Sequence, residues 1–216
     1  NRRSRGLGDV YKRQIKNLIK KGFQLNVYDI NPKITKRLDK DNIKTVNNLR
    51  AVANNKFIIS ILPDTQNVES VFKTDSGIVS YLKPGTIVID MSTISSSSAI
   101  EIGKVLQKQQ IEFLDAPVSG GVKGALNANL SIMVGGKKDT YKKSLDILSC
   151  LGENVIYAGK FGMGQVFKMC NQIMVGSHIQ AMCEAFALCK SKGGDLKLLK
   201  ETLIGGSANS WMLENL

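Results

Sequence analysis

Residues 86–114 read TIVIDMSTISSSSAIEIGKVLQKQQIEFL, and this stretch decides the fold class. It opens with a short apolar run, Thr86–Asp90 (TIVID), and closes with another, Glu112–Leu114 (EFL). Runs of this length are typical of buried strands, and Ser95–Gln109 between them has the periodicity of an amphipathic helix. A strand, a helix and a second strand in this order form the repeating unit of a parallel sheet covered by helices.

The same alternation continues on both sides of this unit. Further strand-length runs are Gln24–Tyr28 (QLNVY), Phe57–Leu62 (FIISIL), Leu130–Val134 (LSIMV) and Asn154–Ala158 (NVIYA). Amphipathic helical segments lie among them: Ile15–Lys21, Pro32–Lys40, Thr65–Phe72 and Lys138–Leu151. The sequence therefore predicts a Rossmann-like, doubly wound and mostly parallel α/β sheet over residues 15–161, with the first four strands buried.

The pattern changes at about Gly162. Met163–Lys192 has no proline and only two glycines, and its apolar residues recur at helical spacing, which predicts one long helix. A second helix is expected over Asp195–Leu203, with Asp195 as its N-cap. Residues 162–216 are thus predicted to hold a connecting helix and the start of a truncated all-helical domain.

The first fourteen residues (NRRSRGLGDVYKRQ) differ from the rest, because they are rich in arginine where the remainder is rich in lysine and asparagine. GLGDVYKRQ also resembles the translation of a sequencing adapter, so residues 1–14 are expected to be a non-native leader. The alternative is that Gly6–Gly8 belongs to a phosphate-binding loop. Tyr11 occupies the third glycine position of that motif, however, and no apolar strand precedes Gly6.

The composition is that of an ordinary globular chain. Of its 216 residues, 43% are hydrophobic and 22% charged, which argues against disorder and against a fibrous fold. No apolar run approaches the roughly 18 residues that cross a bilayer, and the basic N-terminus lacks the apolar core of a secretory signal. No membrane association is expected.

A net charge of +12 raises the question of nucleic-acid binding, but the distribution of the charge argues against it. Most of the arginines lie in the first fourteen residues, and the lysines elsewhere are interleaved with Asp and Glu, as on solvated helix faces. Aromatic residues, which would stack on bases, make up only 6%. No nucleic-acid partner is expected.

Cysteine and histidine usage indicates a reducing compartment and no metal site. Cys150, Cys170, Cys183 and Cys189 form no C-x-x-C pair, so they are predicted to be reduced thiols of a cytoplasmic protein, or of a mitochondrial matrix protein in a eukaryote. His178 is the sole histidine, which disfavours zinc. It is predicted to be a packed residue of the long helix rather than a base.

In a doubly wound sheet, ligands bind beyond the carboxyl ends of the strands. Asp29 follows the first strand, where a carboxylate accepts hydrogen bonds from an adenosine ribose and repels a 2′-phosphate, which favours NAD over NADP. Alternatively, Asp29 caps the helix that begins at Pro32. Leu62-Pro63-Asp64 follows the next strand. This segment either lies flat against a cofactor or is an ordinary turn. Ser92 and Thr93 offer hydroxyls for a nicotinamide ribose or carboxamide, although Ser95–Ser98 close by is ordinary helix-capping sequence.

Two further segments contain candidate substrate-binding and catalytic residues. Asp115–Gly124 (DAPVSGGVKG) exposes backbone N–H groups after a strand, as a pocket for a carboxylate would. Lys168 and Asn171 are three residues apart on the long helix, hence on one face, which Val166, Met169, Ile173 and Met174 should make apolar. A lysine desolvated there would have a lowered pKa suited to proton transfer. The alternative is a lysine whose ammonium reaches solvent.

These motifs together resemble the β-hydroxyacid dehydrogenase family. The resemblance rests on LPD (62–64), DMST (90–93), DAPVSGGVKGA (115–125) and GMGQVFKMCNQ (162–172), in order and at compatible spacing from about Ile15 to Leu216. The nearest branches are the 3-hydroxyisobutyrate dehydrogenases and the tartronate semialdehyde reductases. Ser207–Leu216 is closer to the reductases and Asp29 to the NAD-using dehydrogenases.

The resemblance implies specific roles and partners. Lys168 would be the catalytic acid/base, Ser119, Gly120 and Gly121 would hold the substrate carboxylate, and Asn171 would bond the substrate. Leu62, Pro63, Asn67 and Thr93 would line the cofactor with Asp29; the cofactor is NAD, with NADP as the alternative. The resemblance further implies a small 3-hydroxy acid or its semialdehyde as substrate and a homo-oligomer at full length. A non-catalytic dinucleotide-binding protein of the same fold is the remaining alternative. With the glycine loop lost, the chain as given is expected to be inactive and to bind NAD weakly.

Overall fold

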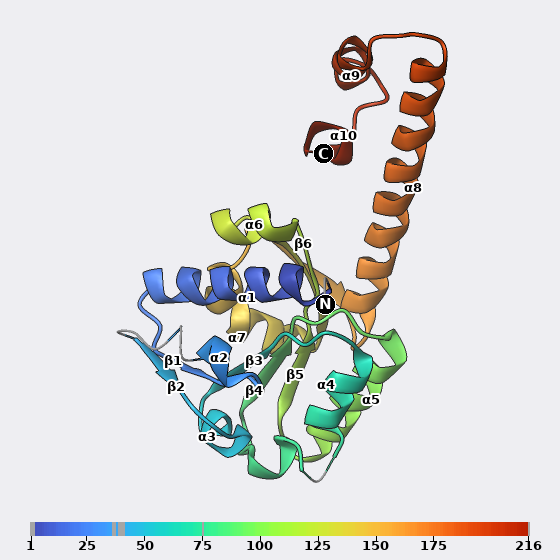
Figure 1. Ribbon diagram of the computed structural model, residues 1–216. Helices are drawn as coiled ribbons and strands as arrows, with labels where there is room; N and C mark the ends of the chain where they lie inside the picture. The colour runs from blue at the N-terminus through green and yellow to red at the C-terminus, as the bar shows by residue number, and fades with distance from the viewer. Residues whose placement is uncertain (1–2, 36–37, 39–41, 75, 216) are drawn as a thin grey trace. The chain divides into compact units, whose positions relative to one another are not determined.

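We describe a computed structural model of the chain (Figure 1). The structure describes residues 3–35, 38, 42–74 and 76–215, with side chains from Val10 onward. The chain divides into two compact units, residues 1–168 and 169–216. The first is an α/β unit and the second is helical.

The strands of the first unit form two sheets within the described residues. The larger has the order β3-β4-β5-β7-β6, with β8 on the other side of β7, and the smaller pairs β1 with β2. The strands are β1 (Leu25–Val27), β2 (Ile43–Thr45), β3 (Phe57–Ser60), β4 (Ile87–Asp90), β5 (Glu112–Asp115), β6 (Val118–Ser119), β7 (Ser131–Gly136) and β8 (Asn154–Gly159). The pairs β1–β2, β3–β4, β4–β5 and β7–β8 are parallel, and β7 runs antiparallel to β5 and β6.

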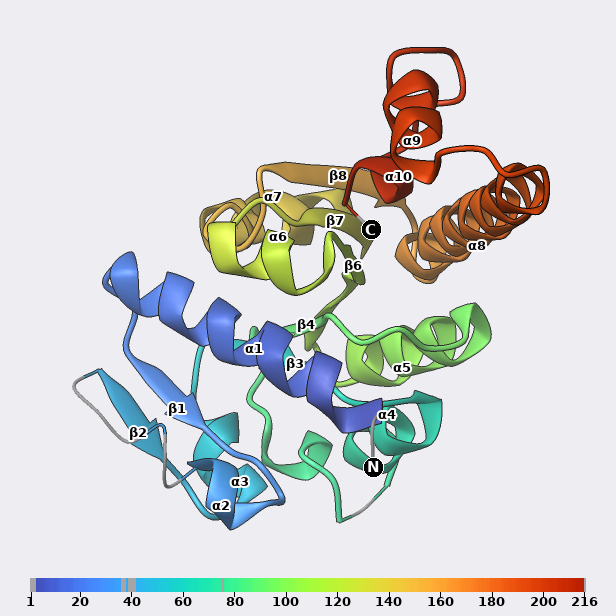
Figure 2. The same cartoon turned by 45° about the horizontal axis from the view of Figure 1, so that its top comes forward.

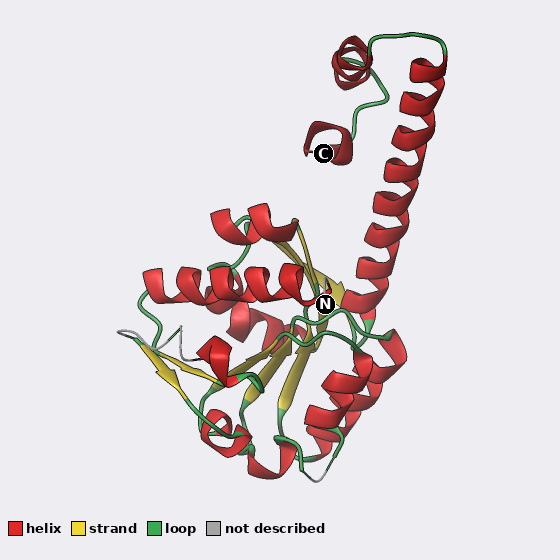
Figure 3. Ribbon diagram, in the orientation of Figure 1, coloured by secondary structure: helices red, strands yellow, loops and turns green. Residues whose placement is uncertain are grey.

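Helices cover both faces of the larger sheet, as expected for a doubly wound fold (Figures 2 and 3). The helices of this unit are α1 (Arg3–Lys20), α2 (Pro32–Thr35), α3 (Leu49–Ala53), α4 (Thr65–Phe72), α5 (Ser96–Lys108), α6 (Gly121–Asn127) and α7 (Lys138–Leu148), with a 3₁₀ turn at Val79–Tyr81. Side chains alternate along each strand. Val88 and Phe113 therefore pack with α3, α4 and α5, whereas Ile89 and Leu114 pack with α1, α6 and α7.

The first helix is longer than predicted. A helix was expected over Ile15–Lys21, but α1 spans Arg3–Lys20, so Gly6–Gly8 lies inside it rather than in a loop ahead of it. Its second half is anchored in the fold, because Leu18 is buried and Asn17 Nδ2 donates to the Ala125 carbonyl on α6 at 2.8 Å. That the first fourteen residues are a non-native leader stays a prediction.

The other differences concern short elements. The first strand is half-buried rather than buried, because it pairs only within the small sheet. The helix expected over Pro32–Lys40 ends at Thr35, and residues 36, 37, 39 and 40 of that range lie outside the described residues. Sequence analysis did not identify β2, β6, α3 or α6, which are short and lack a regular apolar period.

The second unit holds most of α8 (Met163–Ser191), α9 (Leu196–Ile204) and α10 (Trp211–Asn215). Asp195 caps α9 as predicted, accepting the N–H groups of Lys197 and Leu198. None of the helices in the described part of the chain is both long and apolar enough to span a bilayer. The four cysteines are unpaired in the structure, and only Cys150 is buried.

Candidate active site

The carboxyl ends of β3, β4 and β5 lie next to one another. Ser60 is in register with Asp90, and Asp90 with Asp115, so three polar residues end three neighbouring parallel strands. Asp90 and Asp115 are fully buried. Among the described residues, no cluster of three His, Cys, Asp or Glu is arranged to hold a metal ion. Ligands of doubly wound sheets bind beyond the carboxyl ends of the strands, so this edge of the sheet is the candidate site.

Asp90 connects the ends of β3 and β4 through hydrogen bonds. Its Oδ1 accepts hydrogen bonds from Ser60 Oγ at 2.8 Å and from Ser92 Oγ at 2.6 Å. Ser92 Oγ in turn accepts the N–H of Leu62 at 2.8 Å. Burial raises the pKa of Asp90, and these hydrogen bonds lower it by a smaller amount, so the pKa lies above its usual value. The Ser92 hydroxyl is therefore occupied by hydrogen bonds within the protein. Thr93, which follows it in the segment after β4, is exposed.

The residues predicted to line the cofactor lie beyond these exits. Leu62 is half-buried, and Pro63 and Thr93 are exposed. Asn67 stands in the first turn of α4, where its N–H and its Nδ2 both donate to Asp64 Oδ1, at 2.9 and 2.8 Å. These bonds lower the pKa of Asp64, the N-cap of α4. The amide of Asn67 is thus hydrogen-bonded to Asp64 in this structure.

Asp29 lies two residues past the end of β1 and is half-buried. Its Oδ1 accepts the N–H of Asn31 at 2.7 Å, and its Oδ2 accepts the hydroxyl of Tyr11 at 3.4 Å. Asp29 therefore shapes the turn ahead of α2, while Asn31 Oδ1 accepts the N–H of Lys33 in the first turn of that helix at 3.1 Å. The role of Asp29 toward a ribose stays a prediction.

A carboxylate near the end of β1 and a half-buried to exposed segment after β3 and β4 are groups of the kind that bind the nucleoside parts of a dinucleotide. The roles of Asp29, Leu62, Pro63 and Thr93 toward a cofactor stay predictions. The pyrophosphate is not matched in the same way. Gly6–Gly8, the candidate phosphate-binding loop of the sequence, is helical and lies within α1.

The glycine-rich segment after β5 has the backbone conformations that only glycine adopts readily. Gly120 has φ +125° and Gly121 has φ +61°, and α6 begins at Gly121. A Cβ on Gly120 would contact the Leu130 side chain at 3.3 Å, whereas Gly121 faces open space. Ser119 ends β6 and is half-buried. These dihedrals fit the predicted glycine-rich turn; the binding of a carboxylate by its N–H groups stays a prediction.

Lys168 lies in the second turn of α8 and is half-buried. Burial lowers the pKa of its ammonium group, and no salt bridge to it occurs within the described residues. The prediction of a desolvated lysine is confirmed. An amine in this state holds its proton less tightly than a surface lysine does.

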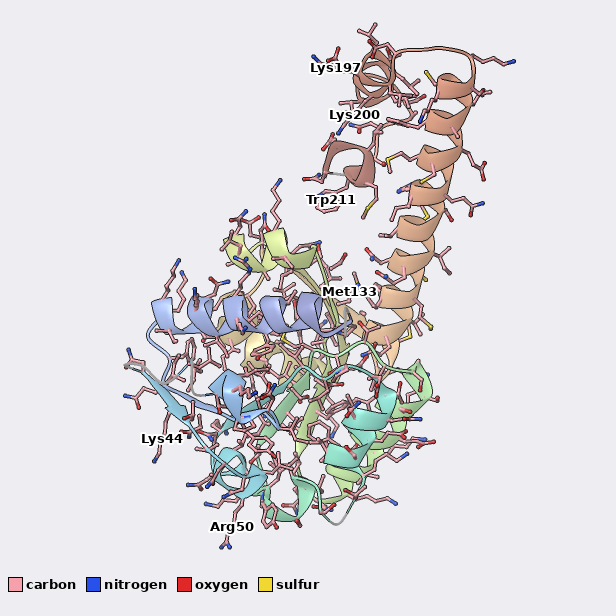
Figure 4. All side chains as sticks on the ribbon, viewed as in Figure 1. Lys44, Arg50, Met133, Lys197, Lys200 and Trp211 are labelled. Atoms are coloured by element: carbon pink, nitrogen blue, oxygen red, sulfur yellow. The ribbon has the colours of Figure 1, made fainter. Side chains whose placement is uncertain are left out.

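The first turn of α8 is packed closely on the sheet. Gly164 lies against the Asp115 and Met133 backbones, so a Cβ there would stand 2.5 Å from the Asp115 carbonyl oxygen. Figure 4 labels Met133 of β7 beside the base of α8. The two buried residues of α8 are Gly164 and Gln165, both in this turn. Lys168 is therefore carried by the fixed end of the helix.

Past Lys168, α8 differs from expectation. Met169, Ile173 and Met174 are 48%, 67% and 56% exposed, so the apolar residues predicted around Lys168 and Asn171 are largely open to solvent. His178 is exposed, and its prediction as a packed residue is wrong, because α8 is buried only in its first turn. Asn171 is half-buried, and its Nδ2 donates to Gln172 Oε1 at 3.0 Å.

Two family models match the chain. The NAD binding domain of 6-phosphogluconate dehydrogenase matches residues 5–159, and the NAD-binding domain of NADP-dependent 3-hydroxyisobutyrate dehydrogenase matches residues 162–216. The chain belongs to the β-hydroxyacid dehydrogenase family. Members are NAD(P)-dependent oxidoreductases, and the doubly wound sheet with a helical C-terminal part is the fold shared with this family.

Similar proteins cover nearly the whole chain. An uncharacterised oxidoreductase of Synechocystis is 36% identical over 98% of this chain and 74% of its own length. The mitochondrial 3-hydroxyisobutyrate dehydrogenase of Mus musculus is 36% identical over 95% of this chain, which spans only 62% of the mouse protein. A solved structure of Mycobacterium tuberculosis 3-hydroxyisobutyrate dehydrogenase with L-serine has a TM-score of 0.88 at 30% identity, covering 97% of this chain and 72% of that one.

Two residues that matter to this site were given no role by the sequence analysis. Asp115 opens the DAPVSGG motif and Gln165 lies inside the GMGQVFK motif, and the structure shows both buried and hydrogen-bonded at the start of α8. The available signal was an acidic residue at the end of a buried strand with no basic residue beside it in sequence.

Proposed function

We propose that this family member transfers a hydride between NAD and a small 3-hydroxy acid, with 3-hydroxyisobutyrate as its substrate. The observation that carries the proposal is Lys168, an amine with a pKa lowered by burial, in the second turn of a helix fixed to the carboxyl ends of the sheet. The mouse and mycobacterial relatives carry the name of this activity. Tartronate semialdehyde is the alternative substrate.

Oxidation of the substrate removes a hydride from the carbinol carbon and a proton from the hydroxyl, leaving a semialdehyde. The nicotinamide ring supplies the hydride-accepting chemistry. Lys168 takes the hydroxyl proton, which requires a neutral amine, and the lowered pKa raises the fraction of neutral amine at a given pH. In the reverse direction, the ammonium of Lys168 returns this proton to the carbonyl oxygen.

The remaining predicted residues bind and orient. Ser119 and the backbone N–H groups at Gly120 and Gly121 are proposed to hold the substrate carboxylate, since such concave N–H arrangements favour anions. Asn171 is proposed to bond the substrate with its amide. Leu62, Pro63, Asn67 and Thr93 are proposed to line the cofactor, with Asp29 at its adenosine ribose.

The test is the absorbance of reduced nicotinamide, followed with the full-length protein and a panel of small acids. The panel includes 3-hydroxyisobutyrate, L-serine, and tartronate semialdehyde in the reductive direction. The highest kcat/KM is expected for 3-hydroxyisobutyrate. If tartronate semialdehyde is turned over better, the alternative holds. If dinucleotide binds and no acid is turned over, the protein is a non-catalytic binder of the same fold and the proposal fails.

Cofactor choice gives a separate prediction. The full-length protein is expected to bind NAD at least ~10-fold more tightly than NADP, because the Asp29 carboxylate faces the 2′ position and like charges oppose each other. Asp29→Ala should bring the two affinities together in calorimetry, and Asp139→Ala, an exposed carboxylate in the first turn of α7, should not. The 216-residue chain is expected to bind NAD weakly. Tighter binding of NADP by the full-length protein would show that Asp29 does not face the ribose.

We also propose that the full-length protein is a homo-oligomer that associates through its helical part. Large apolar side chains of the second unit are exposed, among them Ile173 at 67%, Leu188 at 64%, Leu198 at 61% and Trp211 at 52%. Exposed apolar groups of this kind are typical of interfaces. Sedimentation of the full-length protein as a monomer at micromolar concentration would contradict this proposal.

A further inference from the structure

Asp115 is a buried carboxylate that joins the end of β5 to the start of α8. It is fully buried. Its Oδ1 accepts the N–H of Gly162 at 2.8 Å, and its Oδ2 accepts the N–H of Gln165 at 3.1 Å. The N–H groups at the start of a helix have no partner inside the helix, so this carboxylate satisfies groups that would otherwise be buried without one.

Gln165 makes a second connection from the same helical turn. Its side chain is 1% exposed. Its Oε1 accepts the N–H of Ile94 at 3.1 Å, and its Nε2 donates to the Ser92 carbonyl at 2.9 Å. Ser92 and Ile94 flank Thr93, the exposed hydroxyl after β4. The start of α8 is therefore tied to the exits of both β4 and β5, one turn before Lys168.

We propose that Asp115 and Gln165 are positioning residues that set where the amine of Lys168 stands relative to the exits of β4 and β5. The inference rests on the proposed function, in which Lys168 transfers the substrate proton. A general base must lie within hydrogen-bond reach of its proton, and a misplacement of about 1 Å costs on the order of 10²-fold in rate. A helix held by two buried side chains fixes the position of its next turn.

The ionised form of Asp115 is the form that holds both N–H groups. Protonation turns one acceptor oxygen into a donor facing an N–H, and the charge-assisted bonds are lost. Burial raises the pKa of Asp115 to about 6, against the N–H groups of Gly162 and Gln165, which lower it, and with a further rise from Asp90. Asp90 faces it from β4, α8 presents backbone N–H groups, and β7 presents the backbone at Gly135. No salt bridge to Asp115 exists within the described part of the chain.

Activity and stability should therefore respond to pH in opposite directions. The pKa of Asp115 in the folded protein is above its unfolded value, so its contribution to stability is present at low pH and is lost as pH rises through about 6. The positioning role requires the ionised form, so kcat should fall as pH drops through the same range. Protonation of Asp115 stabilises the folded protein, so acid unfolding through Asp115 cannot explain a fall of kcat at low pH.

The kinetic test uses the full-length protein in the reductive direction. There Lys168 acts in its protonated form, so its own titration does not lower kcat at acid pH. Asp115→Asn should lower kcat about 10²-fold with KM changed less than about 2-fold, and should remove the fall of kcat near pH 6. Asp195→Asn is the matched control, because Asp195 also accepts two helix N–H groups but is exposed. It should leave kcat and its pH profile unchanged.

A direct readout needs no variant. In nuclear magnetic resonance spectra of the wild-type protein, the amide protons of Gly162 and Gln165 should titrate together with a midpoint near 6. Gln165→Met, which removes the second connection only, should speed amide exchange over residues 162–168 by about 10-fold. If Asp115→Asn does not fold, these two measurements still test the inference.

The outcomes separate this inference from the function on which it rests. Wild-type kcat in Asp115→Asn, in a protein that Lys168→Ala inactivates, overturns the inference alone. Amide protons of Gly162 and Gln165 that do not titrate between pH 5 and 7 also overturn it. Full turnover by Lys168→Ala overturns the proposed function, and the inference with it.

Discussion

Replacing Lys168 with alanine is expected to lower kcat of the full-length enzyme at least about 10²-fold, the usual loss when a general acid/base is removed. The amine is half-buried in the second turn of α8, and its pKa is lowered by burial. The substrate's hydroxyl proton would then have to leave to water, so the chemical step should slow while cofactor binding stays as before. Steady-state kinetics with 3-hydroxyisobutyrate and calorimetry with NAD measure the two quantities.

Lys160→Ala is the matched control for this variant, because Lys160 is an exposed lysine just ahead of the same helix. It removes the same charge and side-chain length, and it should keep wild-type kcat. Equal losses in the two variants would mean that the general electrostatic field is responsible rather than a proton transfer by Lys168. Wild-type turnover by Lys168→Ala would remove Lys168 from the mechanism.

The sequence was sufficient for the parts of the fold that rest on a periodic apolar pattern. TIVID became β4, whose residues are all buried, and the helices expected over Thr65–Phe72 and Met163–Lys192 are α4 and α8 within one residue at each end. Buried strands and amphipathic helices carry this pattern because each must present an apolar face to the core. The same logic placed Lys168 early in α8.

What could not be predicted depends on long-range pairing. The residues of β2 (Ile43–Thr45) alternate between half-buried and exposed, and β6 is two residues long, so neither has a strand signature of its own. The role of Asp115 depends on Gly162 and Gln165, which are 47 and 50 residues away along the chain. A hydrogen bond across such a separation leaves no periodicity in the sequence.

The close packing of α8 on the sheet leads to a second large effect. Gly164→Ala is expected to destabilise the protein by about 1–3 kcal/mol, the usual cost of overpacking. The new Cβ would stand 2.5 Å from the Asp115 carbonyl oxygen and 2.8 Å from Asp115 Oδ2, and it would also meet the carbonyl of Met133. Two of these three atoms belong to strand backbone and cannot move aside. Urea unfolding followed by far-ultraviolet circular dichroism measures the change.

Gly176→Ala in the same helix is the matched control and should have the opposite sign. Nothing lies within 4 Å of a Cβ at Gly176. Alanine there should stabilise the helix by roughly 0.5–1 kcal/mol, because an interior glycine loses more backbone entropy on folding. If both substitutions stabilise, α8 does not approach the sheet at Gly164. The carboxylate of Asp115 would then not reach the first turn of α8, and the position of Lys168 would depend on helix propensity alone.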